Sequence, residues 1–178
     1  MTLALHEDCA LVERIQRGDT AAFQALYDKY LRLVYRYVQV RVGDPQEAED
    51  LTAETFIKAW RGLERYQCRD KPVGAWLFRI AHNLIVDKYR RKRVLTDWLP
   101  PQLGAPEHQY ARIEHQDEIR RAFGALNYEQ QVILHMHFFE DYSVDEIAAF
   151  LDKSSNAVRV AQFRALRRLR QIMENETA

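Results

Sequence analysis

The chain has 178 residues, of which 47% are hydrophobic, and its 26 basic and 26 acidic side chains give no formal net charge. This length suits one or two folded domains, and the small numbers of glycine and proline, 6 and 5, argue against a disordered chain. No apolar run is long enough to span a membrane, and the acidic start lacks the features of a secretory signal. We therefore expect a cytoplasmic protein without membrane insertion.

Charge is distributed along the chain in alternating blocks. Residues 65–93 have a balance of +7 and residues 152–173 a balance of +5, whereas residues 94–151 have −7 and residues 1–64 have −3. Two separate basic blocks predict two contacts with a polyanion. The acidic surface between them is left for other partners.

The first half of the sequence is predicted to form a series of helices. Apolar residues recur with the helical period and no convincing strand pattern appears, so we expect helices over about 8–17, 20–42, 44–61 and 75–93. Asp19 or Thr20 can cap the second of these helices. The third begins with Asp44 as N-cap, Pro45 at the first helical position and Glu47 closing a capping box.

The second half is also predicted to be helical. Residues 94–111 hold three of the five prolines and no helical period, which is typical of a linker. Ser143 and Glu146 form a second capping box, and helices are expected over about 112–126, 128–138, 143–151 and 155–173. The predicted fold class is therefore all-α. It consists of two small helical domains, residues 1–93 and 112–178, that share no core and move independently.

The last part of the sequence has the pattern of a helix-turn-helix. Two predicted helices in residues 143–170 are joined by a short turn at 152–154. Their apolar residues are expected to pack against each other, with Ile147, Ala148 and Leu151 on Val158 and Leu166. In such motifs the second helix enters the major groove of DNA.

The second helix of this motif carries candidate DNA-binding residues, namely Ser155, Asn156, Arg159, Phe163, Arg164 and Arg167. Arg159, Phe163 and Arg167 are spaced four apart and therefore lie on one stripe. Arginine can bind guanine through two hydrogen bonds, phenylalanine can contact a thymine methyl group, and the helix N-terminus favours phosphate. An ordinary helical hairpin with a solvated basic face is the alternative interpretation.

A second basic feature is the end of the helix predicted over 75–93, with cations at Lys88, Arg90, Arg91, Lys92 and Arg93. A membrane-surface helix would spread its cations along one face, so a crossing phosphate backbone fits these charges better. Arg79 and Asn83 precede them on a partly exposed side. Nearby rings could hold unstacked bases, although we favour a core position for Trp76.

The remaining polar residues give no sign of catalysis. His135 and His137 lie two apart on a predicted helix and so point to different sides, and we expect no metal. Cys9 and Cys68 are far apart and in no C-x-x-C pattern, which argues against a disulfide scaffold or a zinc site. A thiol sensor at Cys68 is a less favoured alternative. No phosphate-binding loop, nucleophile elbow or carboxylate pair occurs, so we expect no enzyme, cofactor or small-molecule substrate.

Three motifs in this order resemble a known family: DPQEAEDLTAETFIKAW (44–60), AWLFRIAHNLIVDKYRRKR (75–93) and LNYEQQVILHMHFFEDYSVDEIAAFLDKSSNAVRVAQFRALRRLR (126–170). Together they resemble a bacterial sigma factor of the extracytoplasmic-function (ECF) group of the sigma-70 family, over about residues 8–173. The resemblance implies a protein that is not an enzyme. It would bind core RNA polymerase, recognise the −10 and −35 promoter elements, help to open the DNA, and be held inactive by an anti-sigma factor.

The resemblance also implies roles for individual residues. The helix matching 44–60 docks in this family on the coiled coil of the largest-subunit clamp, through Asp50, Glu54, Phe56 and Trp60, and the polymerase flap is a further contact. Residues implied near the −10 element are Lys71, Arg79, Asn83, Lys88, Arg90 and Arg91. Arg159, Phe163 and Arg164 stand at positions that contact the −35 element.

Two other functions remain open at this level. A repressor or activator that acts without polymerase would explain residues 143–170 but leave 44–60 unused. An adaptor that binds RNA or acidic chains through its basic ends is the second alternative. Mixing the protein with core polymerase and looking for comigration separates all three.

Overall fold

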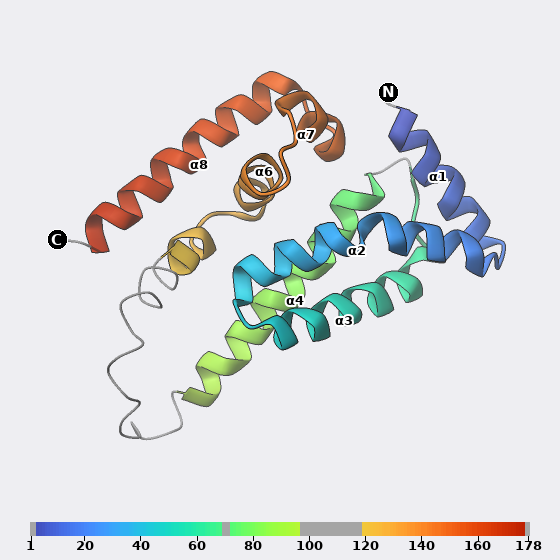
Figure 1. The fold of residues 1–178 in the computed structure, drawn as a ribbon, viewed down its shortest axis with the longest axis horizontal. Coiled ribbons are helices and arrows are strands. Elements are labelled where there is room, and N and C mark those ends of the chain that lie inside the picture. Colours follow the sequence, from blue (N-terminus) through green and yellow to red (C-terminus); the bar gives the residue numbers. More distant parts are fainter. Residues whose placement is uncertain (1–2, 69–71, 97–118, 177–178) are drawn as a thin grey trace.

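The computed structural model describes residues 3–68, 72–96 and 119–176, and the regular structure within these ranges is entirely helical, which confirms the all-α class. The helices are α1 Leu3–Gln16, α2 Thr20–Val42, α3 Pro45–Leu63, α4 Val73–Thr96, α6 Tyr128–Phe138, α7 Val144–Leu151 and α8 Ser155–Glu176 (Figure 1). Residues 119–124 are helical as well. None of the described helices is both long and apolar enough to cross a membrane.

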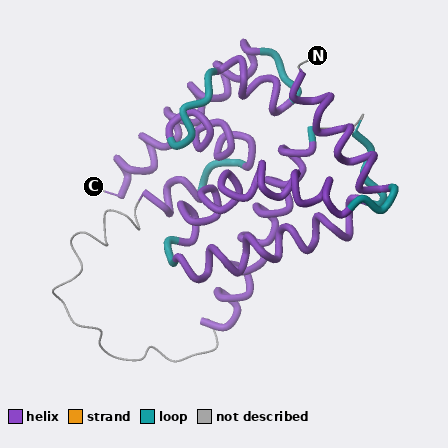
Figure 2. The backbone as a smooth tube through the Cα atoms, turned by 45° about the vertical axis from the view of Figure 1, so that its right-hand side comes forward, coloured by secondary structure: helices purple, strands orange, loops and turns teal. Residues whose placement is uncertain are grey.

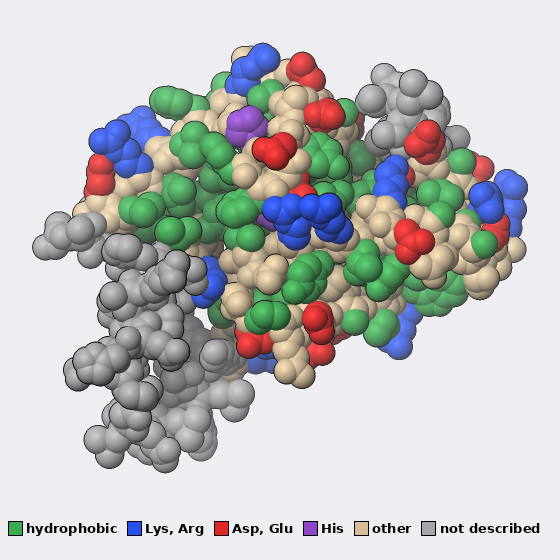
Figure 3. Space-filling view, viewed as in Figure 1, with side chains coloured by type: hydrophobic (Ala, Val, Ile, Leu, Met, Phe, Trp, Pro, Cys, Tyr) green, Lys and Arg blue, Asp and Glu red, His purple; other side chains and the backbone are tan. Residues whose placement is uncertain are grey.

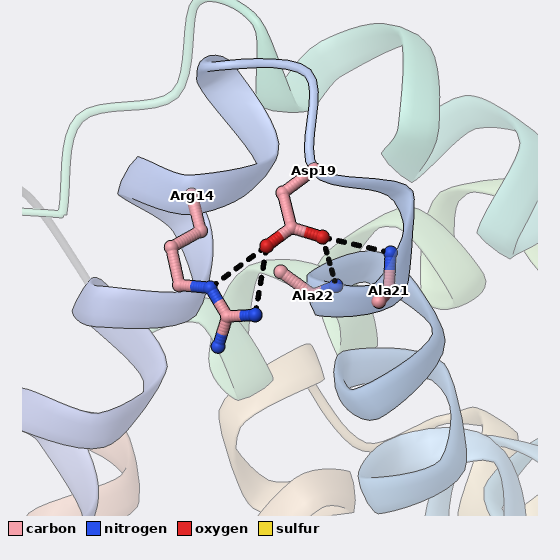
Figure 4. Close-up of polar contacts among 4 residues, drawn as sticks. All are labelled: Arg14, Asp19, Ala21 and Ala22. Atoms are coloured by element: carbon pink, nitrogen blue, oxygen red, sulfur yellow. Dashed lines mark hydrogen bonds and ion pairs between the residues drawn. The ribbon is translucent and has the colours of Figure 1, made fainter.

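The start of α2 shows how a local signal fixes a helix end. One carboxylate oxygen of Asp19 accepts hydrogen bonds from the backbone N–H groups of Ala21 and Ala22, at 3.0 and 3.2 Å (Figure 4). The other oxygen accepts from Arg14 of α1, at 2.9 and 2.7 Å. The bond from Arg14 and the cap bonds hold the pKa of Asp19 below its usual value. Asp19 therefore caps α2 and sets the angle between α1 and α2.

The two predicted capping boxes have different outcomes. At α7 the box is complete, because Ser143 N–H donates to Glu146 at 2.8 Å and Glu146 N–H donates to Ser143 Oγ at 3.3 Å. At α3, Asp44 accepts from Glu47 N–H at 2.8 Å as expected. The Glu47 carboxylate instead forms an ion pair with Lys88 of α4, at 2.9 Å, so the predicted closing contact is wrong. A longer-range charge competes successfully for this side chain.

Helices α2, α3 and α4 pack together, and α1 lies against α2 (Figures 1 and 2). Their core consists of large side chains with no solvent exposure, among them Leu26, Val34, Tyr37, Leu63, Leu77, Phe78 and Ile85. Each such side chain contributes roughly 1.5–3 kcal/mol through burial. Asp8 secures α1 on this bundle, because it accepts from Lys29 Nζ at 2.6 Å and from Tyr30 Oη at 2.5 Å.

A disulfide joins Cys9 of α1 to Cys68, in the turn between α3 and α4. The expectation against a disulfide is therefore wrong. The two residues are 59 positions apart, yet their Cα atoms are 5.6 Å apart. Packing of α1 over the α3–α4 turn brings them together, and sequence spacing carries no information on such a contact.

The second half of the chain packs on the first through α6 and α7. Val132, Ile133 and Met136 of α6 and Ile147 of α7 belong to the same apolar core as the residues of α2 and α4. An ion pair between Arg36 Nε and Glu140 Oε1, at 3.0 Å, adds a polar contact. The prediction that the two halves share no core is wrong.

The physical reason lies in α6 itself. Six consecutive residues of α6, from 131 to 136, are buried, so apolar surface surrounds the helix instead of forming a stripe. Helix α8 covers one side of it through Ala165. The opposite side of α6 is buried only by packing against α2 and α4. The domain boundaries at 93 and 112 lie at or near residues outside the described ranges and stay a prediction.

Gly74, in the first turn of α4, lies at a contact between the two halves. A Cβ atom added at Gly74 would lie 2.4 Å from the ring of Phe150 in α7 and 2.7 Å from the ring of Tyr30 in α2. The ring of Phe150 also meets that of Phe78 edge to face, with centroids 5.4 Å apart. Three helices thus converge on a position that has room for hydrogen only.

Candidate nucleic-acid interface

Helix α8 presents a free basic surface. Arg159, Arg164 and Arg167 are all exposed, and none forms an ion pair with another described residue. Phe163 has 67% of its surface exposed between them. Val158 and Ala165, seven residues apart, anchor the opposite side of the helix with no exposed surface. Cations and a ring on one open face can contact phosphates and base edges without rearrangement.

One residue of the predicted packing was misplaced. Leu166 was expected in the core of this motif, but 40% of its surface is exposed. Ala165 takes the buried place, in a small cluster with Phe123, Leu126 and Leu134. The helical period alone allows either residue, because adjacent positions differ by only 100°.

The turn between α7 and α8 is tight although it contains no glycine. Asp152 adopts the left-handed conformation, with φ of 54°, and its N–H reaches the carbonyl groups at the end of α7. Aspartate tolerates this conformation better than most residues do. Lys153 N–H also donates to the Ala148 carbonyl, at 2.8 Å.

The N-terminus of α8 is less open than predicted. Asn156 is exposed, but the hydroxyl of Ser155 donates to the carboxylate of Asp145. Ser154 caps the helix by accepting from Ala157 N–H at 3.2 Å. Phosphate binding by Ser155 therefore requires the hydroxyl to leave Asp145.

Helix α4 carries its candidate residues in a more enclosed setting. Arg79 is exposed, and its guanidinium lies 5.3 Å from the ring centroid of Tyr128 in α6. Asn83, Arg90 and Arg91 are exposed. Lys88 is half-buried because of its ion pair with Glu47. Lys71 lies outside the described residues.

The rings near α4 are divided between core and surface. Phe78 is fully buried, and Trp76 is half-buried, with its ring 4.8 Å from that of Tyr66. Tyr89 is partly exposed, and its hydroxyl donates to the carbonyl of Arg41 at 2.7 Å. Trp76 and Tyr89 are thus the described rings of α4 that a base could reach.

A third surface lies on α2 and α3. An apolar groove there is lined by Phe23, Tyr27, Ala53, Phe56, Ile57, Trp60 and Arg61. Trp60 and Ile57 expose 44% and 51% of their surfaces. Phe56 is buried and meets Tyr27 edge to face, at 4.6 Å between centroids, so it forms the floor of the groove. The exposed carboxylates of Asp50 and Glu54 lie on the same helix.

Ile57 was missed by the sequence reasoning. It lies four residues after Ala53 and three before Trp60, so it shares their face of α3. That spacing could have identified it. Figure 3 shows that Lys and Arg side chains are interspersed with Asp and Glu on the face drawn there, so the basic blocks of the sequence do not merge into one patch on that face.

Two family models match this chain. The model of sigma-70 region 2 matches residues 26–94, and the model of sigma-70 region 4 matches residues 116–169. The chain is 34% identical over 173 residues to the ECF RNA polymerase sigma factor BldN of Streptomyces coelicolor, covering 93% of this chain and 66% of BldN. It is 31% identical to the RNA polymerase sigma-H factor of Pseudomonas aeruginosa, covering 92% of each chain.

The chain belongs to the sigma-70 family, in its ECF group. Members of this family are transcription initiation factors and not enzymes. Among solved structures, the sigma factor RpoE of Bartonella quintana in complex with the anti-sigma factor NepR has a similar fold, with a TM-score of 0.52 and 20% identity. That match covers 85% of this chain and 96% of RpoE.

In this sigma factor, the region 2 match contains most of the groove of α2 and α3 and the basic residues of α4. The positive charge of α4 comes from arginine and lysine alone. Burial, together with Arg41 and Arg79, lowers the pKa of His82 to about 4, so His82 is neutral at pH 7. Its Nδ1 lies 3.2 Å from the hydroxyl of Tyr37.

The region 4 match contains the exposed arginines of α8. No group of three or more His, Cys, Asp or Glu residues within 3–68, 72–96 and 119–176 could hold a metal ion. His135 is instead a core residue, with its ring 5.4 Å from that of Tyr37. Burial and the nearby Arg36 lower the pKa of His135 to about 3.

Proposed function

We propose that this sigma factor binds core RNA polymerase and directs it to promoters through separate contacts with the −10 and −35 elements. It then supports opening of the DNA. The observation that carries this proposal is the coincidence of region 4 with the unpaired, exposed cations of α8, namely Arg159, Arg164 and Arg167. A helix with this surface has the chemistry needed for phosphates and guanine edges. Residues 1–93 would act as one functional domain and residues 112–178 as the other.

Polymerase docking is assigned to the groove of α2 and α3. The groove exposes apolar side chains such as Ile57 and Trp60. Charged side chains of both signs lie on the same helix, among them Asp50, Arg61 and the ion pair of Glu54 with Lys58. An apolar centre with a charged rim is typical of a protein interface. The proposed partner surface is the clamp coiled coil of the largest subunit, with the flap as a second contact for the other domain.

The −10 element is assigned to α4 and the −35 element to α8. The exposed Arg90 and Arg91 would neutralise phosphates, while Asn83 and the ring of Trp76 would contact bases of the opened strand. On α8, Arg159, Phe163 and Arg164 would read duplex DNA through the major groove. Regulation by an anti-sigma factor, and action in the cytoplasm beside the polymerase, complete the proposal.

The decisive experiment reconstitutes the full chain with core polymerase. We expect comigration on gel filtration and transcripts that depend on a promoter. Trp60→Ala should reduce comigration, while Glu13→Ala, which removes an exposed carboxylate from α1, is the matched control and should not. Absence of comigration would contradict the assignment of function. Tight duplex binding by the free chain that is insensitive to salt would favour a repressor or activator, because phosphate contacts alone depend steeply on salt.

A further inference from the structure

The disulfide between Cys9 and Cys68 lies beside the helix assigned to the −10 element. Its two Cα atoms are 5.6 Å apart, which is within the usual range for a bonded pair. Helix α4 starts at Val73, five residues after Cys68. The sequence contains two cysteines in total, and both belong to this bond.

The noncovalent contacts around the disulfide divide into two groups. One group holds α1 in place without the disulfide, through the bonds from Lys29 and Tyr30 to Asp8. The other holds the first part of the α3–α4 turn, because Gln16 Nε2 donates to the carbonyl groups of Leu63 and Tyr66, at 2.9 and 2.8 Å. The disulfide adds Cys68 to the part of the turn that is tied to α1. Breaking it should therefore release Cys68 from α1 while leaving α1 docked.

Both cysteines are half-buried, so the bond lies at the edge of the fold and not within the apolar core. A protein that binds RNA polymerase works in a compartment where most thiols are kept reduced, and disulfides there are mainly transient and redox-sensing. Structural disulfides are characteristic of secreted proteins instead. The position, exposure and compartment together favour a bond that opens and closes.

We propose that Cys9 and Cys68 are a redox-modification site that undergoes thiol–disulfide exchange with a protein dithiol of the thioredoxin class. A thiolate of the dithiol attacks one sulfur, giving a mixed disulfide, and the second thiol of the dithiol then releases it. Two electrons and two protons pass to Cys9 and Cys68, and the dithiol becomes a disulfide. A low-molecular-weight disulfide such as oxidised glutathione reverses the step by the same exchange.

The consequence for DNA binding rests on the proposed function. In the oxidised form the turn is restrained against α1, and capture of the opened −10 strand has to act against this restraint. The reduced form is then the active one. Because α8 packs mainly on α6 and α7 and lies far from α1 in the chain, −35 binding should not change with the redox state.

The bond itself is tested by alkylation of the full chain followed by mass measurement. After equilibration in buffers of graded oxidised and reduced glutathione, free thiols are trapped with a maleimide. We expect two labels per chain under reducing conditions and none under oxidising conditions, with restoration of both labels by thioredoxin. Two labels under all conditions, or a bond that thioredoxin does not reduce, would overturn the proposal.

The effect on function is tested with the reconstituted holoenzyme and a single-stranded −10 oligonucleotide. We expect oxidised protein to bind it roughly five- to thirtyfold more weakly than reduced protein, the range for restraint of about one backbone residue. Cys9→Ser and Cys9→Ala should bind like the reduced wild type in both buffers. Equal or tighter binding by the oxidised form would overturn the proposal. Loss of polymerase comigration in both redox states would instead contradict the proposed function.

Discussion

Helices α4 and α8 both carry a basic block in the sequence, but they hold their cations differently. Helix α4 packs on α2, α3, α6 and α7, and two of its candidate cations are already engaged, Lys88 with Glu47 and Arg79 with the ring of Tyr128. Helix α8 packs on α6 and α7, and its candidate arginines point to solvent.

This difference shows that a basic block in the sequence gives the number of cations but not whether they are free to bind phosphate. To bind phosphate, Lys88 of α4 has to leave Glu47. A phosphate that approaches Arg79 has to compete with the ring of Tyr128 in region 4. Binding by the arginines of α8 needs no such exchange. We therefore expect promoter contacts of α4 to depend on the arrangement of the whole molecule, and those of α8 to depend on α8 alone.

The largest expected effect breaks the shared core around α4. Phe78→Ala removes a fully buried ring that contacts Tyr37 and Phe150, and we expect a loss of about 3–5 kcal/mol in the free energy of unfolding. Val158→Ala is the matched change on α8 and should cost about 1–2 kcal/mol. Urea denaturation followed by circular dichroism measures both.

The same experiment checks the connection between the two halves. Because α6 is buried against both α8 and α2, the unfolding of wild-type protein should be one cooperative transition. Two transitions, with Phe78→Ala moving only one of them, would show that the halves unfold separately and would contradict the shared core.

The elements of this fold could be predicted from the sequence because their signals are local. Helical period and the capping residues Asp44 and Ser143 gave the helix ends to within a few residues for most of the described helices. The shared core could not be predicted in this way. The pair of Arg36 and Glu140 spans 104 residues, and no local pattern reports which surfaces of two helical units meet.

For the site residues too, local features could be predicted from the sequence and tertiary contacts could not. Exposure of the arginines of α8 could be predicted from a stripe of period four, whereas the choice between Ala165 and Leu166 for the core depended on tertiary packing. The engagement of Lys88 by Glu47 was also missed, since a capping box was the local alternative for Glu47.

A second prediction concerns the free cations of α8. Arg159→Ala should weaken −35 binding by about 1–3 kcal/mol if the guanidinium binds a guanine. Arg168 is exposed on α8 and lies nine residues further on, about half a turn away in angle, so Arg168→Ala is the matched control. A promoter-binding titration with holoenzyme measures both variants. If the two lost affinity equally, the stripe would not be the reading surface.

A third prediction uses pH to loosen the core beside α4. His135 packs near the rings of Tyr37 and Phe78, and neither of its ring nitrogens has a hydrogen-bond partner. Its pKa is about 3 in the folded protein, against 6.5 for an unperturbed histidine, so the unfolded state binds the proton first and the free energy of unfolding decreases as the pH is lowered. We expect a loss of about 2 kcal/mol between pH 6.5 and pH 5 from this residue.

The control for this effect is the variant His135→Gln, measured by urea denaturation over the same pH range. Glu140 acts in the opposite direction, because burial raises its pKa and favours its protonated form as the pH falls. Because His135 Nε2 lies 3.6 Å from Glu140 Oε1, the comparison reports on the two groups together. An unchanged pH slope in the variant would show that His135 does not carry the effect.

The smallest expected effect frees a cation of α4. Glu47→Gln removes the partner of Lys88 and should strengthen binding to −10 DNA by less than about 1 kcal/mol, because the pair is partly exposed. Glu49→Gln, an exposed carboxylate on the same helix, is the control. Fluorescence anisotropy with a −10 oligonucleotide at two salt concentrations would detect the difference. A larger gain with Glu49→Gln than with Glu47→Gln would contradict the exchange at Lys88.

Gly74 allows regions 2 and 4 to pack closely together because it has no side chain. The separation of region 2 from region 4 at this point depends on the absence of a side chain at Gly74. A methyl group there would clash with the rings of Tyr30 and Phe150 and push them away from α4. Substitutions of increasing size at this one position therefore offer a graded mechanical control over how closely the two regions approach, with every cation of α4 and α8 left in place.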